Sequence, residues 1–300
     1  MDHFDEAGCD PPWRVDRRRF MSPLKLRIIE HLTSVVSFVF VVTNLVIWLP
    51  LLLLAALTRI ILPISIVSKI TDKVVEAVYR LAVNIDAWWI LNVLGIELEI
   101  EDDLEVLGGL FPADRLVVIC NHQSWFDIFL LQTLISGRGP ILKFLIKVEL
   151  LWVPVLGWVC LALNFPRLSR KGDAKSRSKD LRSVELASLR LGDEPGGLLI
   201  FPEGTRFSQQ KRAAGDSPYQ HLLRPKSGGF TVIQRSMTEG TRVLDISIRY
   251  NRSDVNCWRC MSGAVGEIHV KVESFQMRDG QNVNEWLNER WVVKDLWLAS

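Results

Sequence analysis

Residues 116–127 read Leu-Val-Val-Ile-Cys-Asn-His-Gln-Ser-Trp-Phe-Asp, an apolar run followed directly by a polar turn. The run Leu116–Cys120 is apolar enough to form a strand that is buried on both faces. A helix is expected to begin at Asp127. Because open α/β sheets place their ligands beyond the carboxyl ends of the strands, the turn between this strand and this helix is a candidate functional site.

After Gly95 the whole chain alternates in the same way between strands and helices. The other expected strands, each apolar enough to be buried on both faces, are Ile96–Ile100, Ile141–Ile146, Val159–Phe165, Gly197–Phe201, Val243–Tyr250 and Glu267–Val272. The expected helices are Asp127–Ser136, Asp173–Leu191 and Gly229–Thr238. Short apolar strands that alternate with helices are typical of α/β proteins. We therefore expect an α/β domain over residues 96–300.

The turn after Cys120 holds a possible general base. His122 and Asp127 are five residues apart, and a continuous helix would rotate them roughly 140° out of register. They can meet only if His122 precedes the helix and the turn bends back. Asp127 would then lie at the helix N-terminus, accept the proton of one ring nitrogen and leave the other nitrogen able to take a proton. The spacing alone is also compatible with coincidence, since the chain has five histidines.

A second polar turn follows the expected strand Gly197–Phe201. It reads Phe201-Pro202-Glu203-Gly204-Thr205-Arg206. Gly204 allows a close approach of the backbone, and the guanidinium of Arg206 offers a fixed fork of donors that suits a phosphate monoester. Glu203 is expected to orient the loop. Taken alone, the turn is also compatible with a surface salt bridge, and the presence of His122 upstream favours the functional interpretation.

The charge balance excludes one class of partner. Lys and Arg number 36 and Asp and Glu number 34, which gives a formal charge of +2 and argues against a surface built for nucleic acid. Hydrophobic residues make up 48% of the chain and charged residues 23%, which excludes intrinsic disorder. Any anionic ligand must therefore be bound by a local group of basic residues.

The cysteines do not indicate a disulfide scaffold or a metal centre. There are five, an odd number, at Cys9, Cys120, Cys160, Cys257 and Cys260, which fits a reducing compartment. Cys257 and Cys260 form a C-x-x-C pair. A structural zinc ion needs four ligands, and the only further candidate nearby is His269. We therefore expect no metal site.

A long apolar segment precedes the α/β domain. Residues 32–58 comprise 27 residues without a charge. As a straight helix this segment would measure roughly 40 Å, more than the roughly 30 Å of a bilayer's hydrocarbon core. It is too long for a signal peptide, and a buried core helix would be shorter and more amphipathic. The segment is therefore expected to enter a membrane.

Basic residues flank the apolar segment on both sides. Arg14, Arg17, Arg18, Arg19, Lys25 and Arg27 precede it, and Arg59, Lys69, Lys73 and Arg80 follow it. Under the positive-inside rule one straight span cannot satisfy both ends. A helix broken near Pro50, or a second pass through residues 60–67, would return the chain to its starting side, so we expect a helical hairpin in or part way into the bilayer. Residues 79–98 are expected to lie against lipid headgroups or to pack on the catalytic domain.

The motifs together resemble the glycerolipid acyltransferase superfamily, the membrane-associated enzymes that make phosphatidic acid. Residues 121–127 resemble its H-x4-D block, and residues 201–206 its F-P-E-G-T-R block. Lys147-Val148-Glu149-Leu150 with Pro154 and Gly157, Asn164-Phe165-Pro166-Arg167, and Leu223-Arg224-Pro225-Lys226-Ser227-Gly228-Gly229-Phe230 resemble its other segments. The resemblance covers roughly residues 100–250 and is strongest to the bacterial YihG-type members and the related animal branch. One departure is Leu244-Asp245-Ile246-Ser247-Ile248, where many members have a Val-Pro block.

The resemblance implies a fold, a reaction and the residues that carry it. The fold would be a mixed, mostly parallel sheet flanked by helices, similar to glycerol-3-phosphate acyltransferase, with the N-terminal membrane helical hairpin. His122 would act as the general base and Asp127 would orient its imidazole. Substrate would be bound by Lys147, Arg167, Glu203, Gly204, Thr205 and Arg206. Backbone amides beside Gly204 would be candidates for an oxyanion hole.

The implied reaction transfers a fatty acyl group from an acyl thioester to the free hydroxyl of a lysophospholipid. The most favoured acceptor is 1-acylglycerol 3-phosphate, which would give phosphatidic acid. The donor would be acyl-CoA or acyl carrier protein, used as a co-substrate, with no cofactor. The protein would then be organised as a basic tail (residues 1–27), membrane-embedded or interfacial helices (28–95) and a catalytic domain (96–300). That domain would face the cytoplasm at a bacterial inner membrane, with membrane lipid as a partner and no nucleic acid.

Three other features remain open at this point. The basic stretch Arg167–Arg182 is compatible with a solvated helix face, or with contact to anionic lipid or coenzyme A phosphates. Trp286, Trp291 and Trp297 indicate either an interfacial helix or aromatic residues packed on the domain. Residues 211–217 are expected to form a mobile loop over the site. The alternative functions are an acyltransferase that acts on another lysophospholipid, a hydrolase with Ser124 as nucleophile, although no G-x-S-x-G is present, and a catalytically silent membrane adaptor.

Overall fold

The structure is a computed structural model that describes residues 22–62, 64–102, 105–152, 157, 160–161, 165–168, 174–237, 241–252, 254–277 and 280–300. Several sequence predictions therefore fall outside the described residues. These are the first 21 residues of the basic tail, Pro154 and Asn164 of the family motifs, Asp173, most of the expected strand Val159–Phe165, and residues 169–173 of the basic stretch.

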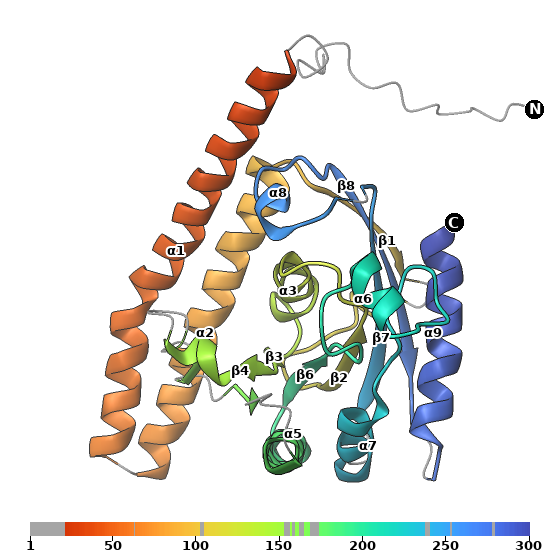
Figure 1. The fold of residues 1–300 in the computed structure, drawn as a ribbon. Helices are drawn as coiled ribbons and strands as arrows, with labels where there is room; N and C mark the ends of the chain where they lie inside the picture. Colours follow the sequence, from red (N-terminus) through yellow and green to blue (C-terminus); the bar gives the residue numbers. More distant parts are fainter. Residues whose placement is uncertain are drawn as a thin grey trace, which may run out of the picture.

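A six-stranded sheet forms the centre of the molecule (Figure 1). Its strands are β1 (Glu97–Asp102), β2 (Arg115–Cys120), β3 (Leu142–Phe144), β6 (Gly196–Ile200), β7 (Arg242–Tyr250) and β8 (Glu267–Phe275). They are ordered β1-β8-β7-β2-β6-β3, and every neighbouring pair is parallel except β7 with β8. A separate pair, β4 (Ile146–Lys147) and β5 (Arg167–Leu168), is also parallel. The mixed, mostly parallel sheet is confirmed.

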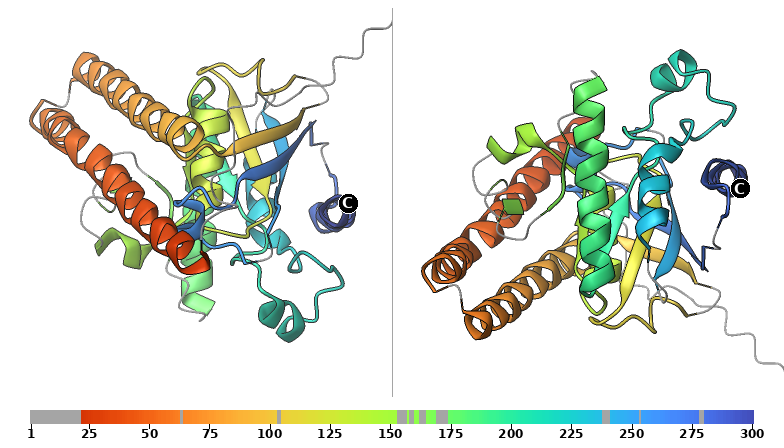
Figure 2. Two further views of the ribbon diagram at one scale, coloured as in Figure 1. Left: turned by 90° about the horizontal axis from the view of Figure 1, so that it is seen from above. Right: turned by 90° about the horizontal axis from the view of Figure 1, so that it is seen from below.

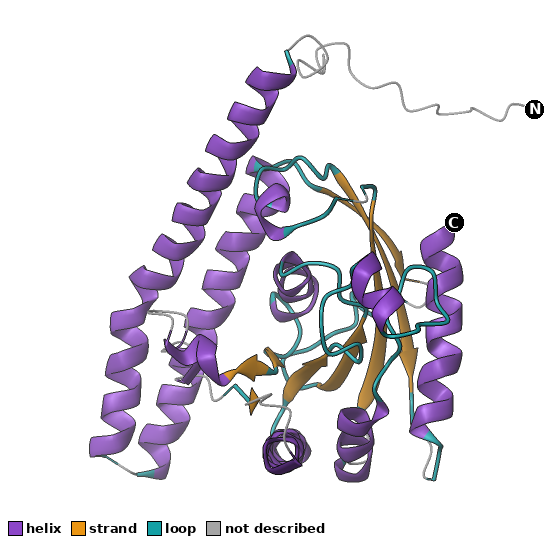
Figure 3. Cartoon of the chain, in the orientation of Figure 1, coloured by secondary structure: helices purple, strands orange, loops and turns teal. Residues whose placement is uncertain are grey.

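Helices cover both faces of this sheet, as Figure 2 and Figure 3 show. One face packs against α3 (Phe126–Leu131), which continues into the π-helical turn Gln132–Ser136. The other packs against α5 (Ala174–Asp193), α7 (Ser227–Ser236) and α9 (Val283–Ala299). On β2, Leu116, Val118 and Cys120 belong to the first core, and Val117 and Ile119 belong to the second. Strand β2 is thus buried on both faces, as its apolar sequence predicts.

The helical hairpin is confirmed, with its turn at a different place from either prediction. Helix α1 (Pro23–Ile61) runs through Pro50 without ending, and α2 (Ser65–Trp88) returns alongside it. The Asn44 side chain donates to the Ala82 carbonyl at 2.9 Å, and Arg59 pairs with Asp72 at 2.6 Å. In the described part of the chain, α1 is the only helix with the length and hydropathy that a membrane crossing requires. Where the hairpin sits in a bilayer remains a prediction.

The end of α2 joins the hairpin to the sheet domain. The Arg80 guanidinium donates to the Ser136 carbonyl at 3.0 Å and to the Gly139 carbonyl at 2.5 Å. Farther along, Ile90 and Leu94 enter the core beside α3. Of the two possibilities for residues 79–98, the structure therefore has packing on the domain.

Four of the expected elements differ in the structure. Cys160 and Leu161 are helical, so a strand over Val159–Phe165 is wrong there, because periodicity does not separate a short buried strand from a buried helix. The expected strand Ile141–Ile146 splits at Leu145, where the chain changes its partner from β6 to β5. Strand β1 is largely exposed, since it is an edge strand with Glu at alternate positions.

The fourth difference concerns residues 211–217, which were expected to form a loop. Residues 209–214 form helix α6 (Gln209–Ala214) instead. The Ser208 side chain accepts from the Lys211 amide at 3.2 Å, which caps the first turn of this helix. The tryptophans near the C-terminus are packed on the domain, since Trp286 and Trp291 of α9 are buried in the core between this helix and the sheet.

Candidate functional site

The strand–turn–helix at residues 116–127 brings His122 and Asp127 together. His122 lies in the turn before α3, and Asp127 lies in the first turn of that helix. The His122 Nδ1 is 2.9 Å from Asp127 Oδ2. With the proton on Nδ1, the carboxylate fixes the tautomer and leaves the distal Nε2 able to accept a proton. The turn therefore bends back in the way that the five-residue spacing requires.

The Asp127 carboxylate is held by four donors. Its Oδ2 accepts from His122 and from the amides of Gln123 and Ser124, at 2.8 and 2.9 Å. Its Oδ1 accepts from the Tyr250 hydroxyl at 2.6 Å. Asp127 is fully buried, and burial raises the pKa of Tyr250 well above its usual range, so the phenol stays protonated and continues to donate. The aspartate is thereby fixed as an acceptor for one ring orientation.

Asn121 fixes the other end of the turn. Its side-chain amide donates to the Ile248 carbonyl at 2.9 Å, and its oxygen accepts from the Ile248 amide at 2.8 Å. The side chain thus continues the pairing of β2 with β7 for one residue beyond the strand. The residue before His122 is locked to the sheet by this pair of bonds.

Aromatic rings bound the space beside His122. The imidazole stacks on Phe201 with ring centroids 4.0 Å apart, and Trp125 meets it edge-on at 6.2 Å. The Arg206 guanidinium carbon lies 5.3 Å from the centroid of the Trp125 ring, a cation–π contact. Trp125 therefore lies between the imidazole and the guanidinium and holds both at one opening.

The loop at residues 201–206 is anchored from beneath by Glu203. This buried carboxylate accepts from the His122 amide and from the Leu223 amide, both at 2.9 Å. Burial is the larger effect on it and raises the pKa of Glu203 to about 8, while the two backbone bonds oppose that rise. Glu203 thus joins the two polar turns, as expected of a residue that orients the loop.

Gly204 has the backbone that the loop requires. Its φ is +70°, in the region that favours glycine. Its amide donates to the Phe201 carbonyl at 2.8 Å and is therefore used within the turn. For an oxyanion hole, the neighbouring amides of Thr205 and Arg206 remain the candidates.

Most of the predicted site residues converge on one cavity of about 110 Å³. Its lining includes His122, Lys147, Gly204, Thr205 and Arg206. Asp127 and Glu203 lie behind that surface, each bonded to His122. Arg167 lines a different cavity, with Lys143 and Arg190 from β3 and α5. The structure does not bring Arg167 to His122, and the roles of all eight residues remain predictions.

Sequence reasoning missed Tyr250, which is 123 residues from its partner Asp127. It also missed Trp125 and Phe201 as ring contacts of His122, although both lie inside the quoted motifs. The signal for Trp125 and Phe201 was that each is an aromatic residue in or beside one of the two polar turns. No local signal links Tyr250 to Asp127, because their contact depends on β7 lying beside β2.

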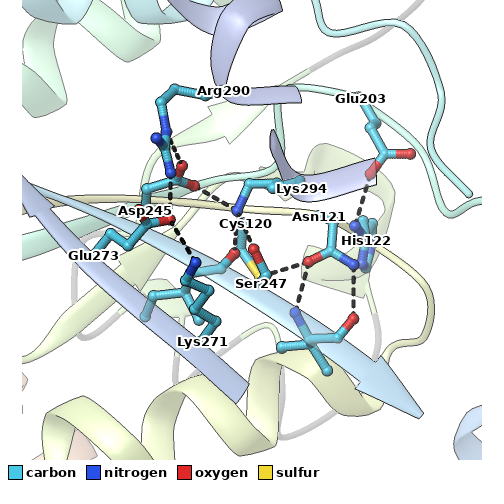
Figure 4. A network of polar contacts seen from close by, with 12 residues as sticks. Cys120, Asn121, His122, Glu203, Asp245, Ser247, Lys271, Glu273, Arg290 and Lys294 are labelled. Carbon is cyan, nitrogen blue, oxygen red and sulfur yellow. Dashed lines mark hydrogen bonds and ion pairs between the residues drawn. The ribbon is translucent and has the colours of Figure 1, made fainter. Parts of the chain in front are cut away.

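Residues 244–248, which stand where many members of the superfamily have a Val-Pro block, contribute to a buried polar network (Figure 4). Asp245 on β7 pairs with Arg290 and Lys294 of α9, at 2.7 and 2.5 Å. The Lys294 ammonium also donates to the Ile246 carbonyl at 2.6 Å and to the Ser247 hydroxyl at 3.0 Å. Asp245 and Ser247 therefore bind the C-terminal helix to the strand that carries Tyr250.

Metal ligation finds little support around the C-x-x-C pair. Cys257 and Cys260 lie on α8 (Cys257–Cys260), where burial raises the pKa of the Cys257 thiol to about 11 and disfavours the thiolate that a metal needs. Among the described residues, one group has the donors for a metal ion, Glu99, Glu267 and His269 on β1 and β8. There His269 Nδ1 is already paired with Glu99 at 2.6 Å.

The sequence matches the profile of a protein family described as Acyltransferase over residues 97–250. Lysocardiolipin acyltransferase 1 of Danio rerio is 27% identical to the chain over 260 residues, which cover 78% of this chain and 64% of that protein. The 1-acyl-sn-glycerol-3-phosphate acyltransferase gamma of Mus musculus is 26% identical over 293 residues, which cover 91% of this chain and 73% of that protein. The chain thus spans less than two thirds of the length of the first relative.

The fold is also found among solved structures. The crystal structure of the 1-acyl-sn-glycerophosphate acyltransferase PlsC from Thermotoga maritima matches with a TM-score of 0.56 and 18% identity, over 91% of this chain and 98% of that one. The comparisons agree with the superfamily that the motifs resemble. The bacterial YihG-type branch remains a prediction.

Proposed function

The chain belongs to the Acyltransferase family, and from this premise we propose that it transfers a fatty acyl group from an acyl thioester to the free hydroxyl of a lysophospholipid at a membrane. The favoured acceptor is 1-acylglycerol 3-phosphate, and the product is then phosphatidic acid. The observation that carries the proposal is the position of His122. Its Nδ1 is held by Asp127, and its ring lines the cavity that also holds Arg206 and Lys147.

The chemistry follows from the orientation of the imidazole. Nε2 of His122 removes the proton from the acceptor hydroxyl as the oxygen attacks the thioester carbonyl. A carbon–oxygen bond forms, the carbon–sulfur bond breaks, and the imidazolium returns the proton to the leaving thiolate. Asp127 stabilises the imidazolium during this step. No covalent enzyme intermediate is needed. Alignment of the two substrates and stabilisation of the oxyanion supply the rate acceleration that the general base does not.

Phosphate binding is assigned to the two cations of the cavity. Arg206 contacts Trp125, and Lys147 of β4 lines the same cavity. A phosphate monoester between them would place the acceptor headgroup beside His122. The guanidinium offers a bidentate fork, and the ammonium adds a point charge.

An apolar cavity adjoins this site and suits an acyl chain. It measures about 150 Å³ and lies between the hairpin and the sheet domain. Val41 and Leu45 of α1 line it, as do Val78 and Val83 of α2. Ile128 and Phe144 are common to this cavity and to the His122 cavity. A chain that lies between the helices would therefore end near the reacting carbonyl.

The test is acyl transfer by the purified full-length chain in detergent, with labelled acyl donor and lysophosphatidic acid. His122→Ala should lower kcat about 10²- to 10⁴-fold with little change in acceptor KM, the usual contribution of a positioned base. Arg206→Ala should mainly raise the acceptor KM. If Arg206→Ala affects phosphate-bearing and phosphate-free acceptors equally, the assignment of Arg206 is wrong.

A hydrolase reaction with Ser124 as nucleophile has less support. Ser124 is buried, and its hydroxyl oxygen accepts from the Phe126 amide at 3.2 Å within the turn before α3. Ser124→Ala should leave acyl transfer near normal. Loss of acyl transfer in Ser124→Ala would instead favour Ser124 as a nucleophile. A wild-type chain that transfers to no acceptor would favour the membrane adaptor.

A second acceptor follows from the relatives. The protein from Danio rerio is named a lysocardiolipin acyltransferase, so lysocardiolipin is the alternative acceptor for this chain. One donor should be assayed against lysophosphatidate, lysocardiolipin and lysophosphatidylcholine. The ratio of kcat/KM values identifies the acceptor.

A further inference from the structure

A second, basic cleft lies on the other side of the loop at residues 201–206. It measures about 410 Å³, and its lining includes Thr205, Lys211, Arg224 and Lys226. Thr205 also lines the His122 cavity, so the two spaces share one loop. The mechanism proposed above uses none of the three basic residues of this cleft.

The cleft carries uncompensated positive charge. Lys211, Arg224 and Lys226 are exposed, and Glu203 is the one carboxyl among the lining residues. Glu203 is 1% exposed and its two oxygens already accept from backbone amides of His122 and Leu223. It therefore contributes little to neutralising the three cations, which can bind an external anion.

The three basic side chains are held at the cleft by the chain around it. The Lys211 ammonium donates to the Thr205 hydroxyl and to the Arg206 carbonyl, both at 2.9 Å. Arg224 donates to the Asp216 carbonyl at 3.1 Å. Lys226 donates its amide to the Pro202 carbonyl at 2.9 Å, and its ammonium lies beside Gly204. An ammonium has three N–H groups and a guanidinium five, so these contacts leave donors for a ligand.

The cleft also lies on the side of the molecule that a water-soluble ligand would reach. Helix α6 and the loop after it are on the side of the sheet domain away from the α1–α2 hairpin (Figure 2). The apolar cavity that suits an acyl chain is on the hairpin side. Thr205 lines both the basic cleft and the His122 cavity, and the His122 cavity shares Ile128 and Phe144 with the apolar cavity.

We propose that this cleft binds the phosphate groups of the acyl donor, a pantetheine thioester. The inference rests on the proposed function, because it names the substrate that the cleft would hold for that reaction. Such a donor has an acyl chain at one end of a flexible arm and phosphate at the other end. Three cations in one cleft suit several phosphates, as in coenzyme A, and a carrier protein offers the single phosphate of its phosphopantetheine arm. The stretch Arg167–Arg182, the alternative place for these phosphates, begins at a separate cavity lined by Arg167.

The test compares donors that carry successively fewer phosphates. Acyl-CoA, acyl-dephospho-CoA, acyl-4′-phosphopantetheine and acyl-pantetheine are assayed with lysophosphatidate, using the full chain and the variants Arg224→Gln and Lys226→Gln. Acyl-4′-phosphopantetheine, which differs from acyl-pantetheine by its phosphate alone, separates recognition of phosphate from contacts with adenosine. Each variant should raise the KM for acyl-CoA about five- to tenfold, the effect of losing one exposed charge-assisted contact. The KM for acyl-pantetheine, the acceptor KM and kcat should not change. Unchanged use of acyl-pantetheine also shows that the variants are folded.

Arg182→Gln is the matched control, since Arg182 is an exposed basic residue of α5 within the alternative stretch. An increase of the acyl-CoA KM in Arg182→Gln alone would overturn the proposal and place the donor phosphates at α5. An equal effect of the cleft variants on acyl-CoA and acyl-pantetheine would overturn it too, because phosphate would then not be recognised. Assays with acyl carrier protein as the donor distinguish the phosphate of its phosphopantetheine arm from the phosphates of coenzyme A. An effect of the cleft variants on that donor alone supports the proposal with the carrier protein as partner.

Calorimetric titration with coenzyme A, without acceptor, separates this proposal from the proposed function. Weaker binding in Arg224→Gln and Lys226→Gln supports the cleft even if the wild type transfers to no acceptor. Normal transfer by the wild type, with binding and donor KM unchanged in both variants, overturns the cleft and leaves the proposed function intact.

Discussion

At the scale of single residues, the proposed mechanism makes the carboxylate of Asp127 the group that orients His122 as a general base. Three of its four donors come from the turn itself, and the fourth is the hydroxyl of Tyr250 on β7. A hydrogen bond to an ionised acceptor is stronger than one between neutral groups. In the proposed mechanism Tyr250 is therefore a positioning residue, which acts on the substrate only through Asp127 and His122.

Tyr250→Phe should lower kcat about tenfold with little change in either KM. Loss of the phenol leaves the Asp127 charge less compensated, so the imidazolium is favoured. The acidic limb of the kcat/KM profile should then move to higher pH. The measurement is a pH–rate profile, with Tyr219→Phe as control, since the Tyr219 hydroxyl bonds Asn288. If kcat/KM falls at every pH and the acidic limb keeps its position, Tyr250 has a structural role only.

Glu203 predicts a dependence of stability on pH. Burial raises its pKa from 4.5 to about 8, so the folded chain binds the proton more tightly than the unfolded chain does. Stability should therefore fall as the pH rises from about 4.5 to about 8, by up to about 1.4 kcal/mol per pH unit. The free energy of unfolding at pH 5, 6.5 and 8 measures this decline. Glu203→Gln should remove that decline, and the exposed Glu194→Gln should retain it. If the free energy of unfolding changes with pH in the same way in the wild type and in Glu203→Gln, Glu203 is not the group that causes the decline.

At the scale of elements, α9 is attached to the sheet by buried charge as well as by apolar packing. Lys294 is 1% exposed and Asp245 is 1% exposed, and they pair beneath Trp291. Removing one partner of a buried pair leaves the other without compensation, which costs about 3–5 kcal/mol. When Lys294 is removed, Arg290 still pairs with Asp245 and compensates part of its charge.

Lys294→Met should therefore lower the free energy of unfolding by about 3 kcal/mol, the lower end of that range. The double variant Asp245→Asn with Lys294→Met should be less unstable than the sum of the single variants. Arg182→Met, which breaks the exposed pair with Glu185, should cost less than about 1 kcal/mol. Denaturant titration measures all of them. Additive effects of Asp245 and Lys294 would show that they do not stabilise each other.

At the scale of the whole molecule, the hairpin and the sheet domain present different surfaces to their surroundings. The outer side of α1 exposes Val35, Phe38, Val46 and Leu53 in a chain segment without charges. Exposed apolar area of this extent is typical of a surface that binds a membrane or another protein, and under the proposed function it faces the membrane. The sheet domain is tied to the hairpin through Arg80 and the core residues after α2. Its active site would therefore lie close to the lipid surface.

A labelling experiment in lipid vesicles checks this arrangement. Val46→Cys on α1 and Leu186→Cys on α5 replace side chains of similar exposure, 43% and 44%. A membrane-impermeant maleimide should label Leu186→Cys in intact vesicles and Val46→Cys only after detergent is added. The unmodified chain gives the background from the native cysteines. Equal labelling of both variants in intact vesicles would contradict insertion of α1.

The local sequence was sufficient for much of the fold and for the central pair of the site. The buried strand β2, the helices α5 and α7 and the hairpin follow from hydrophobic periodicity and from a long run without charges. His122 and Asp127 are neighbours in the chain, so the turn between them had only a few ways to bring them together. The two backbone amides that donate to Glu203, those of His122 and Leu223, were not predictable in the same way, because they lie 81 and 20 residues away along the chain.

Only the tertiary structure determined the contacts between distant segments. The order of the strands places β7 beside β2, which brings Tyr250 to Asp127 and Ile248 to Asn121. The same packing takes Arg167 away from His122 and creates the basic cleft behind residues 201–206. Periodicity reports which face of an element is buried and does not report which element covers it. Contacts across the sheet are set by how all the apolar faces can be covered at once.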